Sequence, residues 1–506
     1  MDGAANISQI VLVSNRGPFS FSFVEGELLV RRGAGGLVTA IGGVARAHDV
    51  LWISCALSRG DAQWVAQVGG GVQTVEGMRI RLTVPDPAQY RGYYSVISNP
   101  LLWFVQHQLQ DAPRYPLIDQ ATWQAWSHGY AGVNRQLAAT VADSLQRVSG
   151  RAVVLVQDYH LYLLPRYLRE LLGERVYIHF FSHIPWPGPD AWHVLPSKMR
   201  LELLTALLHT DRIGFQTERD TRRFLQTCVA NLPEIRVTRP WRQIVHRGRA
   251  IAAAPYPISV DVAALQQQLA RPEMRELAAR VRRMRGDRRL LLRVDRVEPS
   301  KNILRGLIAY RNFLTAYPEY RGQVLLLCLL VPSRSEVAQY RDYLRDITAL
   351  TGEINATLGD GDWEPVRLLL GHHYLRALAA LSEYDVLLVN PLADGMNLVA
   401  KEGAVLNRRD GVLILSEEAG AAEELGAHAL LVAPFDVYGT AEAIRQALTM
   451  PPEERHARAV RLAEQVRDHD IHGWFARQLA DIARDLDRAA VAVDDADREG
   501  VGQPAP

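Results

Sequence analysis

The chain has 506 residues, of which 48% are hydrophobic and 22% charged, values that exclude a chain disordered throughout. Lysine and arginine number 57 and aspartate and glutamate 56, so the net charge of +1 gives no general electrostatic reason to expect nucleic acid or a membrane as partner. Three widely spaced cysteines form no CxxC pair and favour a reducing compartment. With no secretory signal at the N-terminus and no apolar run long enough to span a bilayer, we expect a cytoplasmic protein.

Short apolar runs alternate with longer amphipathic stretches along most of the chain. The runs that predict strands are residues 10–14, 50–54, 152–157, 175–182, 213–216, 290–294, 323–331, 365–370, 386–389 and 412–416. Most are apolar without interruption, which is typical of parallel strands that are covered on both faces. Helical patterns lie between them, for example over residues 197–208 and 302–314. The sequence therefore predicts an α/β fold with doubly wound sheets.

The alternation is interrupted near residues 252–262 (AAAPYPISVDV), where two closely spaced prolines break regular structure. We expect two Rossmann-like domains that face each other across a cleft, with ligands beyond the carboxyl ends of the strands. The first domain is predicted over residues 1–255 and the second over 256–486. A last helix at about residues 471–486 is expected to pack back on the first domain, and residues 487–506 are expected to form a flexible tail.

A glycine-rich turn follows the first predicted strand. The segment SNRG carries Arg16, and the later glycines Gly35 and Gly36 lie where backbone N–H groups can approach a phosphate or a sugar hydroxyl. The turn lacks the GxGxxG spacing of dinucleotide folds and the GK[ST] ending of a P-loop. Hydride transfer and ATP hydrolysis therefore lose their usual signatures, although an ordinary turn also explains these residues.

Two further polar residues follow buried strands of the first half. Asp158 ends the strand at residues 152–157, where it either caps the next helix or binds a sugar hydroxyl. His183 follows the strand at residues 175–182 in the segment HIPWP, whose two prolines restrict the shape of the loop. For both residues a structural and a functional role are open at this point.

Cationic residues follow strands of the second half. Arg296 and Lys301 lie five positions apart in RVEPSK, on a turn that opens a helix. A planar guanidinium group, a mobile ammonium group and the helix dipole together suit a diphosphate. Arg334, in PSR, either emerges at the edge of the cleft or is an ordinary surface arginine.

The most specific motif is DGMNLVAKE at residues 394–402, after a buried strand. Asp394 can hold a sugar hydroxyl from the loop, and Glu402, in the following helix, can accept hydrogen bonds from both hydroxyls of a ribose. The backbone N–H groups that we expect to face the cleft belong to Gly395, Met396, Asn397 and Leu398. A nucleotide sugar fits this arrangement.

These motifs occur along the chain in this order: SNR, AGGL, YYSVISNPLLW, QDYHL, HIPWP, GFQTERD, YPISVD, RVEPSK, PSR and DGMNLVAKE. On these motifs, the chain resembles the trehalose-6-phosphate synthase family of retaining glycosyltransferases over about residues 10–486. The resemblance implies the GT-B architecture and transfer of glucose from UDP-glucose to glucose 6-phosphate, with retention of configuration and with no metal or cofactor. Nucleotide sugar and sugar phosphate are the implied partners, and a homo-oligomer is possible.

The resemblance also assigns roles to residues by motif position. The acceptor phosphate is assigned to Arg16, Tyr94, Trp103 and Arg334. The catalytic set is His183, Asp158, Arg296, Lys301 and Asp394, in which Asp158 contacts an acceptor hydroxyl, His183 and Asp394 contact the donor glucose, and Arg296 with Lys301 holds the diphosphate. The remaining donor contacts are Gly35, Gly36, Gly395, Met396, Asn397, Leu398 and the ribose acceptor Glu402.

Three departures from the family pattern leave alternatives open. Cys55 stands where the family usually has a tryptophan against the acceptor sugar, Asn302 where it has a glycine, and Ala393 where it has an arginine. The donor nucleotide (UDP, ADP or GDP) and the carbon skeleton of the acceptor are therefore open, and a glucosylglycerol-phosphate synthase or a cyclitol-coupling relative is an alternative. A silent sugar-phosphate sensor is another. A hydrolase with His183 and Asp158 as acid and base lacks a nucleophile or a metal.

Overall fold

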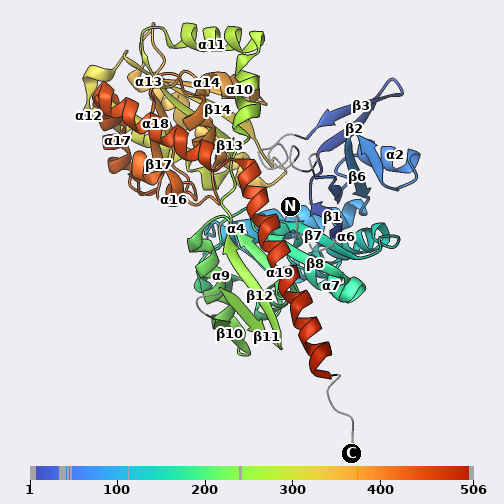
Figure 1. The fold of residues 1–506 in the computed structure, drawn as a ribbon. Helices are drawn as coiled ribbons and strands as arrows, with labels where there is room; N and C mark the ends of the chain where they lie inside the picture. The colour runs from blue at the N-terminus through green and yellow to red at the C-terminus, as the bar shows by residue number, and fades with distance from the viewer. Residues whose placement is uncertain are drawn as a thin grey trace, which may run out of the picture.

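The structure is a computed structural model that describes residues 7–33, 42, 45, 48–111, 113–238, 242–334, 336–372 and 374–500, with side chains up to residue 488. It contains a ten-stranded sheet, a six-stranded sheet and a two-stranded hairpin. The elements of the ten-stranded sheet form the first lobe, and those of the six-stranded sheet form the second lobe. The two lobes lie one above the other in Figure 1.

The first lobe is built on a mostly parallel sheet. Its strand order is β10-β11-β12-β9-β8-β7-β1-β4-β6-β5. The seven strands from β12 to β6 in this order are mutually parallel. At one edge β11 runs antiparallel to both β10 and β12, and at the other edge β5 runs antiparallel to β6. The strands are β1 Ile7–Ser14, β4 Leu51–Cys55, β5 Gln73–Val75, β6 Met78–Thr83, β7 Arg151–Gln157, β8 Val176–Phe181, β9 Arg212–Phe215, β10 Ile235–Thr238, β11 Gln243–His246 and β12 Arg249–Pro255, and the separate hairpin is β2 Phe19–Val24 with β3 Glu27–Arg32.

The second lobe has a fully parallel sheet of order β15-β14-β13-β16-β17-β18. Its strands are β13 Arg289–Val297, β14 Val324–Pro332, β15 Val366–Leu370, β16 Val386–Val389, β17 Val412–Ser416 and β18 Leu430–Val432. β13 and β14 pair along their whole length, with Arg296 opposite Val331. This register brings the residues that follow the two strands to the same edge of the sheet.

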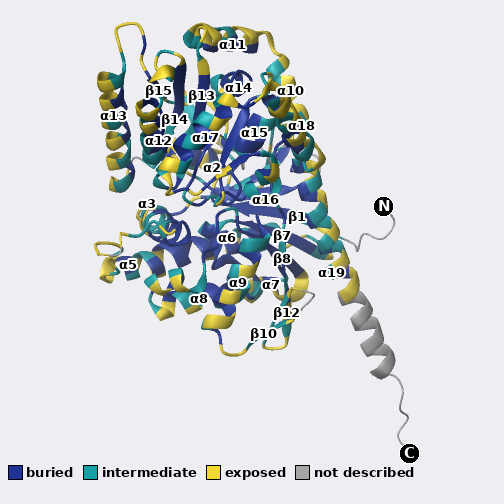
Figure 2. Ribbon diagram, turned by 90° about the vertical axis from the view of Figure 1, so that its left-hand side faces the viewer, coloured by how far each residue is buried: buried dark blue, intermediate teal, exposed yellow. Residues whose placement is uncertain are grey.

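Helices cover both sheets. Those of the first lobe are α2 Arg59–Gln67, α3 Pro87–Arg91, α4 Trp103–Gln106, α5 Gln120–Gln124, α6 Ala131–Ser144, α7 Leu164–Leu172, α8 Ser197–Leu207 and α9 Glu218–Asn231, with wider π-helical segments at Gly92–Leu102 and Ala125–Tyr130. Those of the second lobe are α10 Val262–Ala270, α11 Pro272–Arg285, α12 Ile303–Ala316, α13 Ala338–Leu358, α14 Tyr374–Leu381, α15 Leu398–Leu406, α16 Ala422–Leu425, α17 Val437–Thr449 and α18 Pro452–Asp468. In Figure 2 the central strands of both sheets are buried, and most exposed residues lie on the helices and loops around them. No helix in the described part of the chain is both long enough and apolar enough to cross a membrane.

The chain passes between the lobes twice. The first passage follows β12, and the second joins α18 to the last helix, α19 Ile471–Gly500. The two passages touch, because the N–H of Ile471 donates to the carbonyl oxygen of Val260 at 3.2 Å. From there α19 runs back along the first lobe (Figure 1), where Asp481 and Asp485 form ion pairs with Arg212 at 3.1 and 2.8 Å.

The α/β fold and all ten predicted strands are confirmed, within one to three residues at their ends. The expected interruption begins later than the sequence indicates, because β12 continues to Pro255 and ends at the first of the two prolines. The flexible tail predicted from residue 487 stays a prediction, and α19 continues into this segment as far as Gly500. The chain from 487 to 500 contains several alanines and no proline, so nothing breaks the helix there. Residues 501–506 lie outside the described residues.

Candidate active site

The cations of the second lobe meet carboxylates at the carboxyl ends of its central strands. Lys301 lies on a short turn between β13 and α12, and its Nζ lies 2.5 Å from Oδ2 of Asp394, which follows β16. Asn397 also donates to Asp394 Oδ2, at 3.0 Å. Burial would lower the pKa of Lys301, but the carboxylates of Asp394 and Asp295 raise it, so the ammonium group remains charged.

Arg296 lies at the end of β13 and Arg334 follows the neighbouring strand β14, and the two share a carboxylate that the sequence analysis did not identify. The Nη1 atoms of Arg296 and Arg334 lie 3.2 and 3.4 Å from the same Oε1 of Glu298. Glu298 is wholly buried, which would raise its pKa, yet the charges of Arg296, Arg334 and Lys301 hold that pKa at about 2. The Arg296 side chain is 52% exposed, so it is accessible to a ligand.

Arg334 connects the second lobe to the first. Its guanidinium carbon lies 4.1 Å from the ring centroid of Trp103, and its Nη2 donates to the hydroxyl of Tyr159 at 3.3 Å. Nη1 donates to the hydroxyl of Tyr340 at 2.5 Å. Burial would lower the pKa of Arg334, but the surrounding phenols and Glu298 raise it, so a permanently charged group lies on an aromatic surface of the other lobe.

The other two predicted phosphate-binding residues lie near this arginine. Tyr94 stacks on the imidazole of His160 with ring centroids 5.9 Å apart. Burial, together with the positive charges of Arg334 and Arg16, lowers the pKa of His160. Arg16 itself is exposed after β1. Tyr94 therefore packs against an imidazole whose pKa is lowered in part by the charges of Arg16 and Arg334.

Asp158 and His183 lie side by side at the ends of β7 and β8. The backbone N–H of His183 donates to Oδ1 of Asp158 at 3.1 Å. Asp158 has a positive φ of 77°, which turns the chain at the end of the strand. Burial raises the pKa of Asp158 to about 6, although hydrogen bonds from backbone N–H groups oppose the effect. A carboxyl group of this kind is well suited to accept a hydrogen bond from a sugar hydroxyl.

Both ring nitrogens of His183 have partners. Nε2 lies 2.8 Å from Oε1 of Gln157, and Nδ1 lies 3.3 Å from Nε2 of Gln216. The N–H of Ile258 donates to Oε1 of Gln216 at 2.9 Å, which directs the NH₂ of Gln216 toward His183. His183 therefore carries its proton on Nε2 and accepts at Nδ1, and burial lowers its pKa to about 3. The ring is neutral and is not placed to transfer a proton.

Gly395 brings the loop between β16 and α15, here called the donor loop, against the first lobe. A Cβ atom at this position would lie 1.9 Å from the carbonyl oxygen of His183, so only glycine allows the approach. Met396 is buried, and Asn397 caps α15 by accepting from the N–H of Ala400 at 3.2 Å. Leu398 is the first residue of that helix. The loop therefore ends at a helix N-terminus that lies beside His183.

Glu402 and its neighbour Lys401 lie one turn further along α15. Burial raises the pKa of Glu402 to about 7. Lys401 is 1% exposed at its side chain, pairs with Glu424 at 2.5 Å, and donates to the carbonyl oxygen of Ile258 at 2.8 Å. The backbone of Ile258 is thus held on both sides, by Gln216 through its N–H and by Lys401 through its carbonyl group, a connection that no sequence motif indicated.

Of the positions that depart from the family pattern, Asn302 has a structural explanation, and Cys55 and Ala393 are buried. Asn302 adopts φ 59°, which glycine and asparagine tolerate, and its Nδ2 donates to the carbonyl oxygens of Asn390 and Pro434 at 3.0 and 2.6 Å. Cys55 is 2% exposed within the apolar core of the first lobe, where burial raises its pKa to about 12. Ala393 is buried. Gly35 and Gly36 lie outside the described residues.

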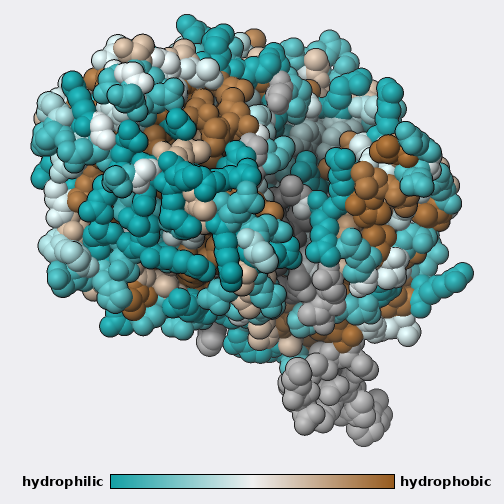
Figure 3. All heavy atoms as spheres, turned by 90° about the horizontal axis from the view of Figure 1, so that it is seen from above, coloured by the Kyte–Doolittle hydropathy of each residue, from teal (hydrophilic) through white to brown (hydrophobic). Residues whose placement is uncertain are grey.

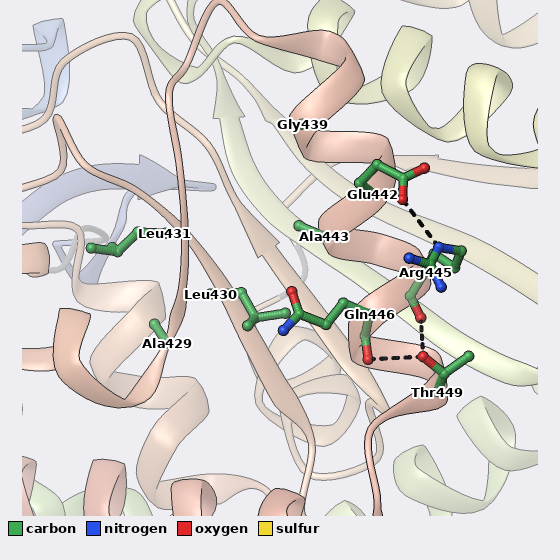
Figure 4. Close-up of a pocket in the computed structure, with 9 residues that line it drawn as sticks. All are labelled: Ala429, Leu430, Leu431, Gly439, Glu442, Ala443, Arg445, Gln446 and Thr449. Atoms are coloured by element: carbon green, nitrogen blue, oxygen red, sulfur yellow. Dashed lines mark hydrogen bonds and ion pairs between the residues drawn. The ribbon is translucent and has the colours of Figure 1, made fainter.

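A separate hollow of about 510 Å³ lies on the second lobe between β18 and α17 (Figure 4). Its polar residues are engaged with one another: Arg445 donates to Glu442 at 3.1 Å, and Thr449 donates to carbonyl oxygens of its own helix. None of the predicted site residues lines it. The surface of the molecule seen from above is mostly hydrophilic, with apolar residues in separate patches (Figure 3). Among the residues that the structure describes, no group of three His, Cys, Asp or Glu side chains is arranged to hold a metal ion.

Comparisons with known proteins agree over nearly the whole chain. The model of Glycosyltransferase family 20 matches residues 8–484. The chain is 34% identical over 480 residues, 92% of its length, to a bifunctional trehalose-6-phosphate synthase/phosphatase of Thermoproteus tenax, and the match spans 62% of that protein.

Two solved structures are similar to the chain with a TM-score of 0.80. One is trehalose-6-phosphate protein from E. coli bound with UDP-2-fluoro glucose, which is 30% identical and matches 94% of this chain and 99% of the other. The second is an alpha,alpha-trehalose-phosphate synthase (UDP-forming) from Burkholderia xenovorans in complex with glucose-6-phosphate, which is 29% identical and matches 93% of this chain and all of the other.

Proposed function

We propose, because the chain belongs to glycosyltransferase family 20, that it transfers glucose from UDP-glucose to glucose 6-phosphate and so forms trehalose 6-phosphate and UDP. The observation that carries this proposal is the presence of three cationic residues near the contact between the lobes. Arg296 and Lys301 lie beside the donor loop, and Arg334 lies on Trp103 of the other lobe. The relatives bound with UDP-2-fluoro glucose and with glucose-6-phosphate support the same pair of substrates.

The donor is proposed to lie on the second lobe. Arg296 and Lys301 would hold the diphosphate, and the start of α15 would add its dipole, so that the negative charge that develops on the leaving group is stabilised by groups already in place. Glu402 would accept from the ribose hydroxyls. Asp394 is held by Lys301 and Asn397, and would bind a hydroxyl of the donor glucose.

The acceptor is proposed to lie on the first lobe, with its phosphate among Arg16, Tyr94, Trp103 and Arg334. Asp158 would accept from an acceptor hydroxyl. His183 is proposed to contact the donor glucose as a neutral ring of fixed tautomer, because both of its nitrogens are occupied. These assignments follow the motif positions, and the arrangement of the side chains supports them.

The reaction is proposed to occur on one face of the sugar. The described residues place no free carboxylate clearly behind the donor site as a nucleophile, since Asp394 is paired with Lys301. We therefore infer that the C–O bond to the leaving diphosphate breaks as the acceptor oxygen attacks from the same side, and that the leaving phosphate oxygen takes the proton of the acceptor hydroxyl. Contact between Gly395 and His183 would exclude water from this step.

Several finer statements belong to the same proposal. The division at about residue 255 makes each lobe a substrate-binding domain, with the acceptor on residues 1–255 and the donor on 256–486. A cytoplasmic location fits the three buried free cysteines. The main alternative is another phosphorylated acceptor, because Cys55 replaces the aromatic residue that the family pattern has beside the acceptor sugar.

A matrix of donors and acceptors tests the function. UDP-, ADP- and GDP-glucose are each combined with glucose 6-phosphate, glycerol 3-phosphate, free glucose and a phosphorylated cyclitol, and the products are identified by mass. We expect a disaccharide phosphate from UDP-glucose and glucose 6-phosphate. Equal release of UDP with free glucose would contradict the role of Arg16 and Arg334, and a product only with another phosphate would replace the assigned acceptor.

A further inference from the structure

Glu298 occupies an unusual position between the two substrate sites. It follows β13, while Ser333 and Arg334 follow β14, and the parallel register of these strands brings both loops to one point. Its Oε1 lies within 3.2–3.4 Å of a nitrogen of Arg296, a nitrogen of Arg334 and the hydroxyl of Ser333. One oxygen atom therefore contacts a cation proposed for the donor diphosphate and a cation proposed for the acceptor phosphate.

The environment of this carboxylate differs from that of an ordinary buried ion pair. The Glu298 side chain is 0% exposed, and its second oxygen, Oε2, has no hydrogen-bond partner among the described residues. Two guanidinium groups that share one oxygen also repel each other, and the carboxylate charge is what offsets this repulsion. Both arginines are the groups that phosphate oxygens would bind in the proposed reaction.

We propose that Glu298 is a positioning residue that takes the place of a substrate phosphate in the free protein, holding Arg296 and Arg334 at a fixed separation and weakening the affinity for each phosphate-bearing substrate. The inference rests on the proposed function for the identity of the substrates. It goes beyond that function because it assigns a role to a residue that would touch neither sugar nor nucleotide.

The proposal and a merely structural role of Glu298 predict opposite changes in anion affinity when the charge of Glu298 is removed. If Glu298 competes with substrate phosphates for the two arginines, removing its charge while keeping its shape will tighten the binding of both anions. It will also slow turnover, because the carboxylate no longer fixes the separation of the two guanidinium groups and the substrates bound to them are less well aligned. If Glu298 only supports the fold, its removal will weaken binding and lower thermal stability together.

The test compares Glu298→Gln, Glu298→Asp and the wild-type chain by calorimetric titration with UDP and, separately, with glucose 6-phosphate and inorganic phosphate. For Glu298→Gln we expect dissociation constants for UDP and for phosphate at least about fivefold lower than in the wild type, with kcat about tenfold lower. Glu298→Asp retains the charge on a shorter side chain, so its affinities should stay close to those of the wild type while its kcat falls. The matched control is Glu383→Gln, a side chain 10% exposed that pairs with Arg282 at 2.6 Å and takes no part in the site.

The outcomes separate this inference from the proposed function. Unchanged or weaker binding of both anions by Glu298→Gln would overturn the role of Glu298, whether or not the wild-type chain is active. If Glu298→Gln does not fold, a Glu298→Asp variant with wild-type affinities and wild-type kcat would overturn it as well. Failure of the wild-type chain to form a disaccharide phosphate would instead contradict the proposed function, while the titrations with UDP and inorganic phosphate would still measure the effect of Glu298.

Discussion

The carbonyl oxygen of His183 faces the α-carbon of Gly395 so closely that the two lobes touch there without any side chain between them. A methyl group at residue 395 would lie 1.9 Å from that oxygen. The donor loop can therefore approach the segment after β8 this closely only because residue 395 has no Cβ.

Gly395→Ala is expected to lower turnover by about 100-fold, because a displacement of about 1 Å between reacting groups has an effect of that size. The fold should survive, since the lobes can separate. The measurement is steady-state kinetics together with a thermal melt. The control is Gly352→Ala, on the exposed side of α13, where a Cβ meets nothing within 4 Å and should leave the kinetics unchanged. Wild-type turnover in a folded Gly395→Ala protein would contradict the close approach of the lobes.

Lys301→Ala should lower turnover by roughly 10²- to 10³-fold, the usual effect of losing one preorganised charge at a leaving group. Asp394 would then keep only its hydrogen bond from Asn397. Steady-state rates with UDP-glucose provide the measurement, and Lys198→Ala on the exposed surface of α8 is the matched control. Unchanged kinetics in a normally folded Lys301→Ala protein would rule out a diphosphate role.

The KM for UDP-glucose should depend on pH through Glu402. Burial raises its pKa from 4.5 to about 7, so the free energy of unfolding that this group contributes is fully present below pH 4.5 and is lost as the pH rises through about 7. The ionised carboxylate is the better acceptor for ribose hydroxyls. We expect KM to fall roughly five- to tenfold between pH 6 and pH 8, as the ionised fraction rises. Glu402→Gln should show a flat profile, and the same slope in that variant would assign the effect to another group.

Gln216→Glu should make turnover pH-dependent. A carboxylate cannot donate to Nδ1 of His183, so the ring would take up a proton there and the pKa of His183 would rise from about 3. We expect lower turnover that partly recovers at high pH, where the ring loses the proton. Gln478→Glu is the control. Gln478 makes an equivalent contact outside the site, because its Oε1 lies 2.9 Å from Nε2 of the buried His179. Equal pH profiles for both variants would exclude a specific role for Gln216.

Cys55→Trp is expected to destabilise the protein rather than to restore an acceptor wall. The side chain is 2% exposed in a packed core, and overpacking costs about 1–3 kcal/mol or more. The nearby Tyr90, whose hydroxyl donates to Asn15 at 3.2 Å, is the better candidate for an aromatic surface beside the acceptor. Denaturant unfolding measures the effect, with the smaller change Cys55→Ser as a comparison. A stable Cys55→Trp protein with a lower KM for glucose 6-phosphate would contradict this expectation.

The strands and the residues at their ends could be predicted from the sequence because buried parallel strands are continuous apolar runs and ligands meet their carboxyl ends. That is why Asp158, His183, Lys301 and Asp394 could be predicted as site residues from the sequence alone. Strands such as β6 and β12 were missed because neither is a continuous apolar run: β6 alternates apolar and polar residues, and β12 is largely alanine.

The roles of some residues depend on contacts that are distant in the sequence, and these roles could not be predicted although the residues lie within the motifs. Gln216 and Lys401 matter because both bind the backbone of Ile258, and Glu298 matters because β13 and β14 are neighbours in the sheet. The tautomer of His183 likewise follows from an amide 33 positions away. Such relationships arise from tertiary pairing, which local patterns do not encode.

The hydrogen bond between Ile471 and Val260 has a consequence for how the lobes can move. Two covalent passages that lie side by side form a double tether, and a double tether permits rotation about the line through both passages far more readily than twisting or sliding. We therefore expect the lobes to move relative to each other mainly by rotation about this line. Arg212 fixes α19 to the first lobe, so a chain ending before residue 471 would have a single tether and would gain the other rotations. Restoring the contact between the lobes at Gly395 would then cost more conformational entropy.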